Sequence, residues 1–209
     1  MQFRDRALPS VANLIESHRI LRTGAKGPDP HKGILQASVF MLCASWELYC
    51  ESVLIEALDK LLEYKENPDT FPDAVQMQLK TAVHGDNAAK SRALELAGDG
   101  WKKVLRDAAV DKVGRFNTPK PENIDKLFRQ FLGVKDLSSS WAGGAEEVES
   151  FVVLRGDIAH NGVEAEKVNR DSATHLKAVI SKVVTETDDA LYAFLREETG
   201  KAPWQKTAK

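Results

Sequence analysis

The longest apolar pattern in the chain runs from about Ile34 to Tyr64. Apolar side chains recur there at alternate spacings of four and three residues: Leu35, Val39, Leu42, Trp46, Tyr49 and Val53. This spacing places them on one face of an α-helix, because 3.6 residues make one turn. The pattern therefore predicts a long core helix, around which we expect an all-α bundle.

Shorter helical patterns precede and follow this helix. We expect an N-terminal helix from Ser10 to about Arg22, and a long final helix that begins with Asp171 or Ser172 as its cap. Between the core helix and the final helix, further short helices are predicted over Asp73–Val83, Ala88–Ala97, Trp101–Val113 and Asn123–Leu132. No pair of strands is predicted, so the expected fold class is all-α.

Length and composition favour a single domain over residues 1–209, with flexible ends at 1–9 and 200–209. A chain of 209 residues with 43% hydrophobic content is large enough for one sizeable core. The formal net charge of −2 argues against broad nonspecific binding to nucleic acid, although charge can still be distributed unevenly.

The sequence lacks the usual patterns of a metal site, a disulfide or a membrane span. Cys43 and Cys50 lie seven positions apart, about 10 Å along one helix and beyond disulfide reach, and there is no Cys-x-x-Cys or His-x-x-x-His pair. The longest uncharged run, Gly33–Trp46, has 14 residues, fewer than the roughly 20 that a span requires. The first residues lack the apolar region of a secretory signal. We therefore expect a cytoplasmic protein without a metal, a cofactor or a membrane segment.

A second stretch, Phe151–Gly162, contains the residues best suited to chemistry. Its apolar start predicts a helix, and Asn161 and Gly162 tolerate the left-handed backbone that ends many helices, so His160 falls in or near the last turn. RNA carries its own nucleophile, the 2′-hydroxyl, and its cleavage needs a proton acceptor and a cation. An unperturbed histidine has a pKa of roughly 6.5, and the guanidinium of Arg155 binds phosphate oxygens without losing its charge.

Arg155 and His160 do not share one face of a regular helix. Five positions at about 100° each place the two side chains about 140° apart. A single helix would therefore present them poorly to one phosphate. Two helices that meet near a two-fold axis bring the arginine of one copy beside the histidine of the other, so we expect a homodimer.

The string from Arg155 to His160, with its Asn161-Gly162 ending, resembles the signature of the HEPN superfamily, in which Arg and His are separated by four to six residues. Ala44-Ser-Trp-Glu-Leu-Tyr49 and Pro121-Glu-Asn-Ile-Asp-Lys-Leu-Phe128 resemble its RiboL-PSP-HEPN branch. The resemblance implies an all-helical domain that usually dimerises and often cuts RNA without a metal, using the motif of both subunits in one cleft. In this branch an acid at the position of Glu47 faces the motif helix.

The candidate site follows from the motif and the resemblance. Many family members have Asn or Asp directly after the arginine, whereas this chain has Gly156 there and an acid one position later. The catalytic candidates are Arg155, His160, Asp157 and Glu47, the last as a carboxylate that orients Arg155 or His160. The candidate RNA contacts are Asn161 and His175. Two simpler interpretations stay open: Glu47 borders solvent, and His175 is an ordinary surface histidine.

These observations predict a metal-independent endoribonuclease of HEPN type that cleaves RNA through the substrate 2′-hydroxyl. The resemblance suggests a toxin or defence effector that acts as a homodimer, with an antitoxin or other protein as partner. Gly156 favours an alternative, a catalytically silent HEPN-like module that binds RNA, a nucleotide or a protein. A helical scaffold is the third option.

Overall fold

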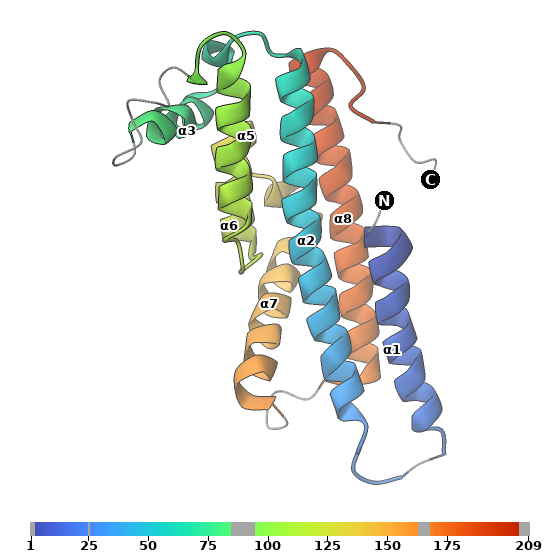
Figure 1. The fold of residues 1–209 in the computed structure, drawn as a ribbon. Coiled ribbons are helices and arrows are strands. Elements are labelled where there is room, and N and C mark those ends of the chain that lie inside the picture. The colour runs from blue at the N-terminus through green and yellow to red at the C-terminus, as the bar shows by residue number, and fades with distance from the viewer. Residues whose placement is uncertain (1–2, 25, 85–94, 163–167, 205–209) are drawn as a thin grey trace. The chain divides into compact units, whose positions relative to one another are not determined.

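The computed structural model describes residues 3–24, 26–84, 95–162 and 168–204, which form helices joined by turns and loops (Figure 1). In chain order the elements are η1 (Phe3–Ala7), α1 (Leu8–Leu21), α2 (Lys32–Tyr64), η2 (Pro68–Thr70), α3 (Asp73–His84), α5 (Gly100–Val113), α6 (Pro121–Leu132), η3 (Ser138–Ser140), α7 (Gly144–Asn161) and α8 (Arg170–Thr199). No strand occurs within the described ranges. The predicted all-α fold is confirmed.

The predicted long helix and the predicted motif helix are both present. α2 ends at Tyr64 as expected, and α7 ends at Asn161, directly before Gly162. Gly162 has a φ of 54°, which other residues rarely adopt, and this explains why the helix stops there. The helix predicted over Ala88–Ala97 lies mostly outside the described residues.

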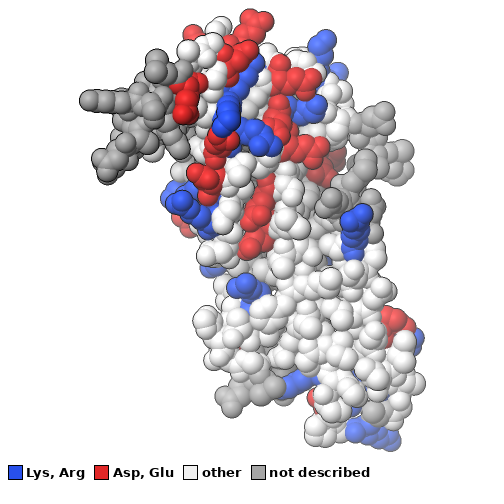
Figure 2. All heavy atoms as spheres, in the orientation of Figure 1, with Lys and Arg blue, Asp and Glu red and all other residues white. Residues whose placement is uncertain are grey.

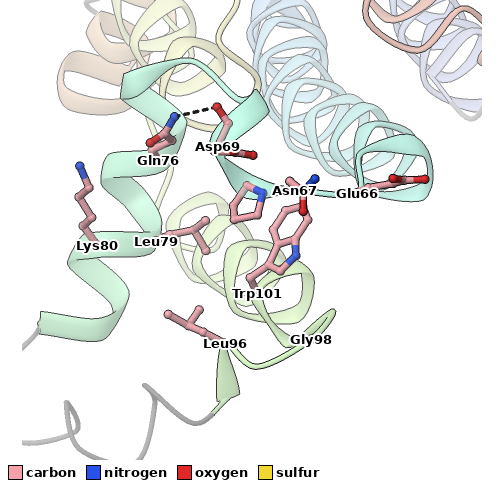
Figure 3. Close-up of a pocket in the computed structure, with 10 residues that line it drawn as sticks. Glu66, Asn67, Asp69, Gln76, Leu79, Lys80, Leu96, Gly98 and Trp101 are labelled. Atoms are coloured by element: carbon pink, nitrogen blue, oxygen red, sulfur yellow. Dashed lines mark hydrogen bonds between the residues drawn. The ribbon is translucent and has the colours of Figure 1, made fainter.

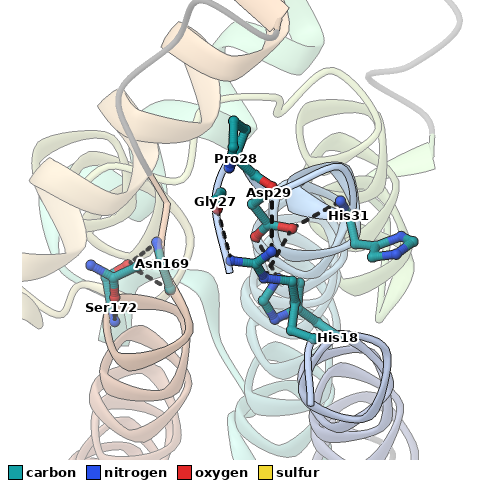
Figure 4. A network of polar contacts seen from close by, with 8 residues as sticks. His18, Gly27, Pro28, Asp29, His31, Asn169 and Ser172 are labelled. Atoms are coloured by element: carbon teal, nitrogen blue, oxygen red, sulfur yellow. Dashed lines mark hydrogen bonds and ion pairs between the residues drawn. The ribbon is translucent and has the colours of Figure 1, made fainter. Parts of the chain in front are cut away.

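The start of the final helix differs from the prediction. α8 begins at Arg170, and its cap is Asn169 rather than Asp171 or Ser172. The Asn169 side chain accepts a hydrogen bond from the backbone N–H of Ser172 at 2.8 Å, and the Ser172 hydroxyl accepts one from the backbone N–H of Asn169 at 3.0 Å (Figure 4). Ser172 therefore completes a reciprocal capping arrangement from inside the helix.

The chain divides into two compact units. Unit 1 comprises Met1–Tyr49, Thr118–Pro121 and Trp141–Glu186, and unit 2 comprises Cys50–Asn117, Glu122–Ser140 and Thr187–Lys209. The helices α2 and α8 each contribute one part to each unit. The prediction of a single domain over residues 1–209 stays a prediction.

Aromatic side chains form the centre of unit 1. Trp46 is fully buried and donates its indole N–H to the carbonyl of Pro119 at 3.1 Å. Its ring packs against Tyr49 and Trp141, with centroid distances of 5.6 and 5.7 Å. Such pairs each contribute about 0.5–1.5 kcal/mol beyond the burial of their area. Because these residues come from distant segments, they join α2 to the chain that precedes α7.

The loop before α2 is also fixed within unit 1. His18 is 6% exposed, and its Nε2 lies 2.8 Å from Oδ2 of Asp29 (Figure 4). The backbone N–H of His31 donates to the other oxygen of Asp29 at 2.9 Å. The hydrogen bond with His18 is the main cause that lowers the pKa of the Asp29 carboxyl. His18 therefore has a structural role, as its place in a mixed helix suggests.

Unit 2 has its own apolar core. The inner face of α6 carries Ile124, Leu127, Phe128 and Phe131, each 2% exposed or less. The C-terminal part of α2 adds Leu54, Ala57 and Leu58, which are fully buried. At the surface, the guanidinium of Arg106 forms two hydrogen bonds with the carboxylate of Asp59, at 2.7 and 3.1 Å, which link α5 to α2.

By length and composition alone, α2 is apolar enough to cross a membrane. Its most apolar window of 18 residues has a mean hydropathy of 1.3, and 44% of that window is buried within the protein. The buried core helix of a soluble protein has the same properties, so this finding carries little weight. Cys43 and Cys50, both on α2, are buried and are not joined in a disulfide.

Candidate functional site

The motif lies in the C-terminal half of α7. Val148, Phe151, Val152 and Ile158 are buried and attach this helix to the core of unit 1. Glu146 and Glu147 lie in the first turn, where carboxylates interact favourably with the positive end of the helix dipole. His160 lies in the last turn, as the sequence predicts.

The side chain of Arg155 lies against α2. Its guanidinium carbon is 5.8 Å from the centroid of the Phe40 ring, a cation–π contact. Its positive charge also lowers the pKa of the Cys43 thiol and of the Glu47 carboxyl, against the larger rise that burial causes in each. These three α2 residues, spaced by three and four, share one face of the helix, which we call the Arg155 contact face. The Arg155 side chain therefore lies on the side of α7 that faces this part of α2.

Glu47 is the carboxylate of this contact face. It is only partly exposed, and burial raises the pKa of its carboxyl while the charge of Arg155 opposes that rise. Burial also raises the pKa of the Cys43 thiol to about 11, so that thiol is protonated near neutral pH. The structure thus places Glu47 near enough to Arg155 for the charge of the arginine to act on the pKa of its carboxyl.

His160, Asp157 and Asn161 lie on the more open part of α7. His160 and Asn161 are exposed, and the Asn161 amide donates to Oδ1 of Asp157 at 2.5 Å. Among the described residues, no hydrogen bond or ion pair joins His160 to Arg155. The two motif side chains therefore point in different directions, consistent with their predicted separation of about 140°.

The end of the motif helix is attached to the beginning of α2. The Gln36 amide donates to the carbonyl of Gly162 at 2.9 Å, across a sequence separation of 126 residues. Because Gly162 directly follows the last turn of α7, this bond helps to fix the backbone that carries His160. The sequence pattern gave no indication of a role for Gln36.

His175 lies apart from the C-terminal end of the motif. Its Nε2 is 2.5 Å from a carboxylate oxygen of Glu147, near the beginning of α7. Glu147 and His160 are 13 positions apart, which corresponds to about 20 Å along a helix. The structure therefore does not bring His175 to the last turn of α7, although both belong to unit 1.

An exposed apolar stripe borders the Arg155 contact face. It consists of Ala37, Met41, Ala44 and Leu48, all exposed and spaced by three or four residues along α2. Met41 is 38% exposed and Leu48 is 59% exposed. Figure 2 shows few charged side chains over α7 and the adjoining part of α2, in contrast to the charged surface over α5. We call this set the α2 apolar stripe. Its regular spacing is visible in the sequence, but the spacing alone does not show that these side chains are exposed.

The exposed face of α7 includes one large apolar side chain beside the polar ones. Val153 is 53% exposed, and it lies about 20° from His160 around the helix axis. A Cβ atom added at Gly156 would meet no atom within 4 Å. Packing within the chain therefore does not explain why position 156 has a glycine and not a larger residue. Among the described residues, no group of three or more His, Cys, Asp or Glu side chains could hold a metal ion.

The fold and the motif together define a HEPN-type helical domain, with an Arg-x-x-x-x-His sequence on a helix that packs against a long core helix. The RiboL-PSP-HEPN family model matches residues 7–193, and the chain belongs to this family. Neither the curated proteins nor the solved structures gave a significant match to the chain. Membership supports a function as an RNase or as a nucleotide-binding module.

Proposed function

We propose that the protein is a metal-independent endoribonuclease whose active site combines Arg155 of one copy with His160 of a second. The observation that carries this proposal is the placement of the two side chains. Arg155 is held against α2 beside Glu47, whereas His160 is exposed in the last turn of α7. Arg155 and His160 both suit RNA cleavage, but one copy cannot direct both side chains to the same phosphate. In the proposed dimer, one copy supplies the arginine of a site and the other copy supplies the histidine.

In the proposed reaction, the imidazole of His160 removes the proton from the 2′-hydroxyl of the substrate. The 2′-oxygen then attacks the adjacent phosphorus, and the bond from phosphorus to the 5′-oxygen breaks. The leaving oxygen takes a proton from water and the protonated imidazole releases its proton to the solvent, which gives a 2′,3′-cyclic phosphate and a 5′-hydroxyl. Arg155 stabilises the charge that builds on the phosphate oxygens.

Glu47 has a positioning role in this scheme. The charge of Arg155 acts on the pKa of the Glu47 carboxyl, and the Phe40 ring contacts the guanidinium. Asp157 and Asn161 are hydrogen-bonded to each other, and we propose that Asn161 contacts RNA beside His160. His175 is a more distant candidate RNA contact, because it is paired with Glu147.

The proposed homodimer uses the α2 apolar stripe and the exposed face of α7. Exposed apolar side chains of this size are common singly, but a regular line of them suggests a surface that another chain covers. The stripe borders the Arg155 contact face, so a second copy seated there would lie near the arginine. An isologous contact would form two equivalent sites.

The first experiment is cleavage of RNA in the presence of a chelator, with identification of the product ends. We expect cleavage to persist and to leave 2′,3′-cyclic phosphates, because the substrate supplies the nucleophile. A requirement for an added divalent metal in the chemical step would contradict the mechanism. A strict monomer that still cleaves at the assay concentration would contradict the shared site.

A second candidate function is a catalytically silent module that binds RNA, a nucleotide or a protein partner. The observation that favours it is Gly156, which occupies a position where many relatives have a polar residue. Absence of cleavage by both the wild type and Gly156→Asn, over varied RNAs, would favour this second function. A cytoplasmic setting as a toxin or defence effector, with an antitoxin or other protein partner, is part of the proposal for the active enzyme.

A further inference from the structure

A pocket of about 450 Å³ lies within unit 2, between the connection from α2 to α3 and the beginning of α5 (Figure 3). Leu79, Leu96 and Trp101 form its apolar walls, and this volume is typical of sites for small organic ligands. Every residue that lines it belongs to unit 2, whereas the motif belongs to unit 1. Binding of a ligand in this pocket is therefore independent of the proposed RNase activity.

The walls of the pocket are fixed by contacts within unit 2. Trp101 is 4% exposed, and its ring packs edge-on against Phe71 with a centroid distance of 5.9 Å. The Gln76 side chain donates to the carbonyls of Phe71, at 2.8 Å, and of Asp69, at 3.2 Å, which ties the α2–α3 connection to α3. A ligand would therefore meet a largely formed site and lose little free energy in ordering it.

The charged groups at the rim favour a positive ligand over a negative one. Glu66 and Asp69 precede α3, and Lys80 lies on α3; Figure 3 shows Lys80 and Glu66 on opposite sides of the apolar walls. All three are exposed, and none has an ion-pair partner among the described residues. Two carboxylates and one ammonium leave one net negative charge, which favours a cation near the acids.

The indole of Trp101 already lies close to one ammonium group. Nζ of Lys102 is 5.7 Å from the ring centroid and 3.3 Å from Oδ1 of Asp99, so its charge is largely balanced by that carboxylate. Among the described residues that line the pocket, the remaining charges are therefore those of Glu66, Asp69 and Lys80. An apolar body would displace water from Leu79, Leu96 and Trp101, and its positive end would lie near the two acids.

We propose that this pocket binds a small organic amine with an aromatic or aliphatic body. Three probes with similar bodies separate the two parts of this proposal: phenethylamine is positive, 2-phenylethanol is neutral, and 3-phenylpropionate is negative. Binding to the full chain can be measured by NMR titration at low ionic strength. We expect the amine to bind most tightly and the carboxylate most weakly, with roughly two- to fivefold between successive probes, the scale of exposed charge pairs.

Two variants test the location. The double variant Glu66→Gln with Asp69→Asn should lower the affinity for phenethylamine to that for the alcohol, whereas Asp111→Asn, an exposed acid on α5, should leave it unchanged. Leu96→Trp should fill the pocket and abolish binding of all three probes, with circular dichroism unchanged. The proposal would be overturned if none of the probes binds at millimolar concentration, if the carboxylate binds most tightly, or if Leu96→Trp leaves the amine affinity unaltered.

Discussion

The two parts of α2 expose different kinds of side chain along the same face of one helix. In unit 1 this face carries the α2 apolar stripe, which ends at Leu48. In unit 2 this side of the helix continues with Ser52, Glu56 and Glu63, which are exposed and polar, and with Ile55, which is half-buried. Nearby, Asp59 and Lys60 form ion pairs with Arg106 and Glu63.

This difference shows which part of the helix is adapted to water. A charged face keeps its hydration and holds ion pairs that contribute little to stability, each about 0–1 kcal/mol. An apolar face of equal length gains free energy when another surface covers it, at roughly 25 cal/mol for each Å² removed from water. If copies of the chain associate, we expect them to do so through the part of α2 that borders Arg155 and not through its charged part.

The largest effect on RNA cleavage is expected from His160→Ala. This substitution tests whether the apolar part of α2 borders an active site. Loss of the proton acceptor should lower the rate of RNA cleavage by roughly 10²–10⁴-fold. Arg155→Ala should also weaken cleavage, while circular dichroism and association stay near those of the wild type. His175→Ala is the matched control, and we expect a much smaller change. Equal losses in the two histidine variants would contradict the assignment.

Leu48→Asp should disrupt association, because it places a charge in the α2 apolar stripe. We expect the dimer dissociation constant to rise by about tenfold or more, measured by sedimentation at several concentrations. Ser52→Asp adds the same charge one turn further along the face and should leave association unchanged. Equal effects of the two substitutions would remove the proposed distinction between the parts of α2.

Gly156→Asn should increase the stability of the fold. The glycine lies inside α7, where glycine costs about 0.5–1 kcal/mol relative to alanine, and a Cβ atom there has free space. Because asparagine is a weaker helix former than alanine, we expect only part of this gain. Thermal unfolding measures the effect. Increased RNA cleavage by the same variant would mean that the glycine attenuates an RNase, and a loss of association would mean that the glycine permits close contact between copies.

Glu47→Gln should have the smallest effect on stability, and its sign depends on pH. Burial raises the pKa of the Glu47 carboxyl above 4.5, so the protonated form favours folding, and that contribution is lost as the pH rises through the raised pKa. Glutamine does not ionise, so the Glu47→Gln variant does not lose this contribution to stability as the pH rises. We expect a Tm increase of no more than about 2 °C at pH 7, and none below the ordinary pKa. A lower Tm at pH 7 would show that attraction to Arg155 outweighs burial.

The helices were predictable because their signals are local. The spacing of apolar residues in α2 and α6, and the Asn161-Gly162 end of α7, depend on the periodicity and backbone preferences of a few neighbouring residues. The cap of α8 was harder to predict, because Asn, Asp and Ser have similar preferences for the cap position. Asn169, Asp171 and Ser172 follow one another closely, and each could serve as the cap.

The site could be predicted only in part. Arg155 and His160 were recognisable from their spacing, and family resemblance pointed to Glu47. The contact of Arg155 with Phe40, the bond from Gln36 to Gly162 and the pocket beside Trp101 all depend on how distant segments pack. Periodicity carries no information about such pairs, because it describes one helix at a time.

The composition of unit 1 from separate segments has a consequence for synthesis. Its first segment ends at Tyr49, and its last begins at Trp141. At a translation rate of about 5–20 residues per second, roughly 5–20 s pass between them. During that interval Trp46 lacks Trp141, and Arg155 does not yet exist. We expect the nascent first segment to be a substrate for chaperones, and two copies to associate only after the segment Trp141–Glu186 has been translated.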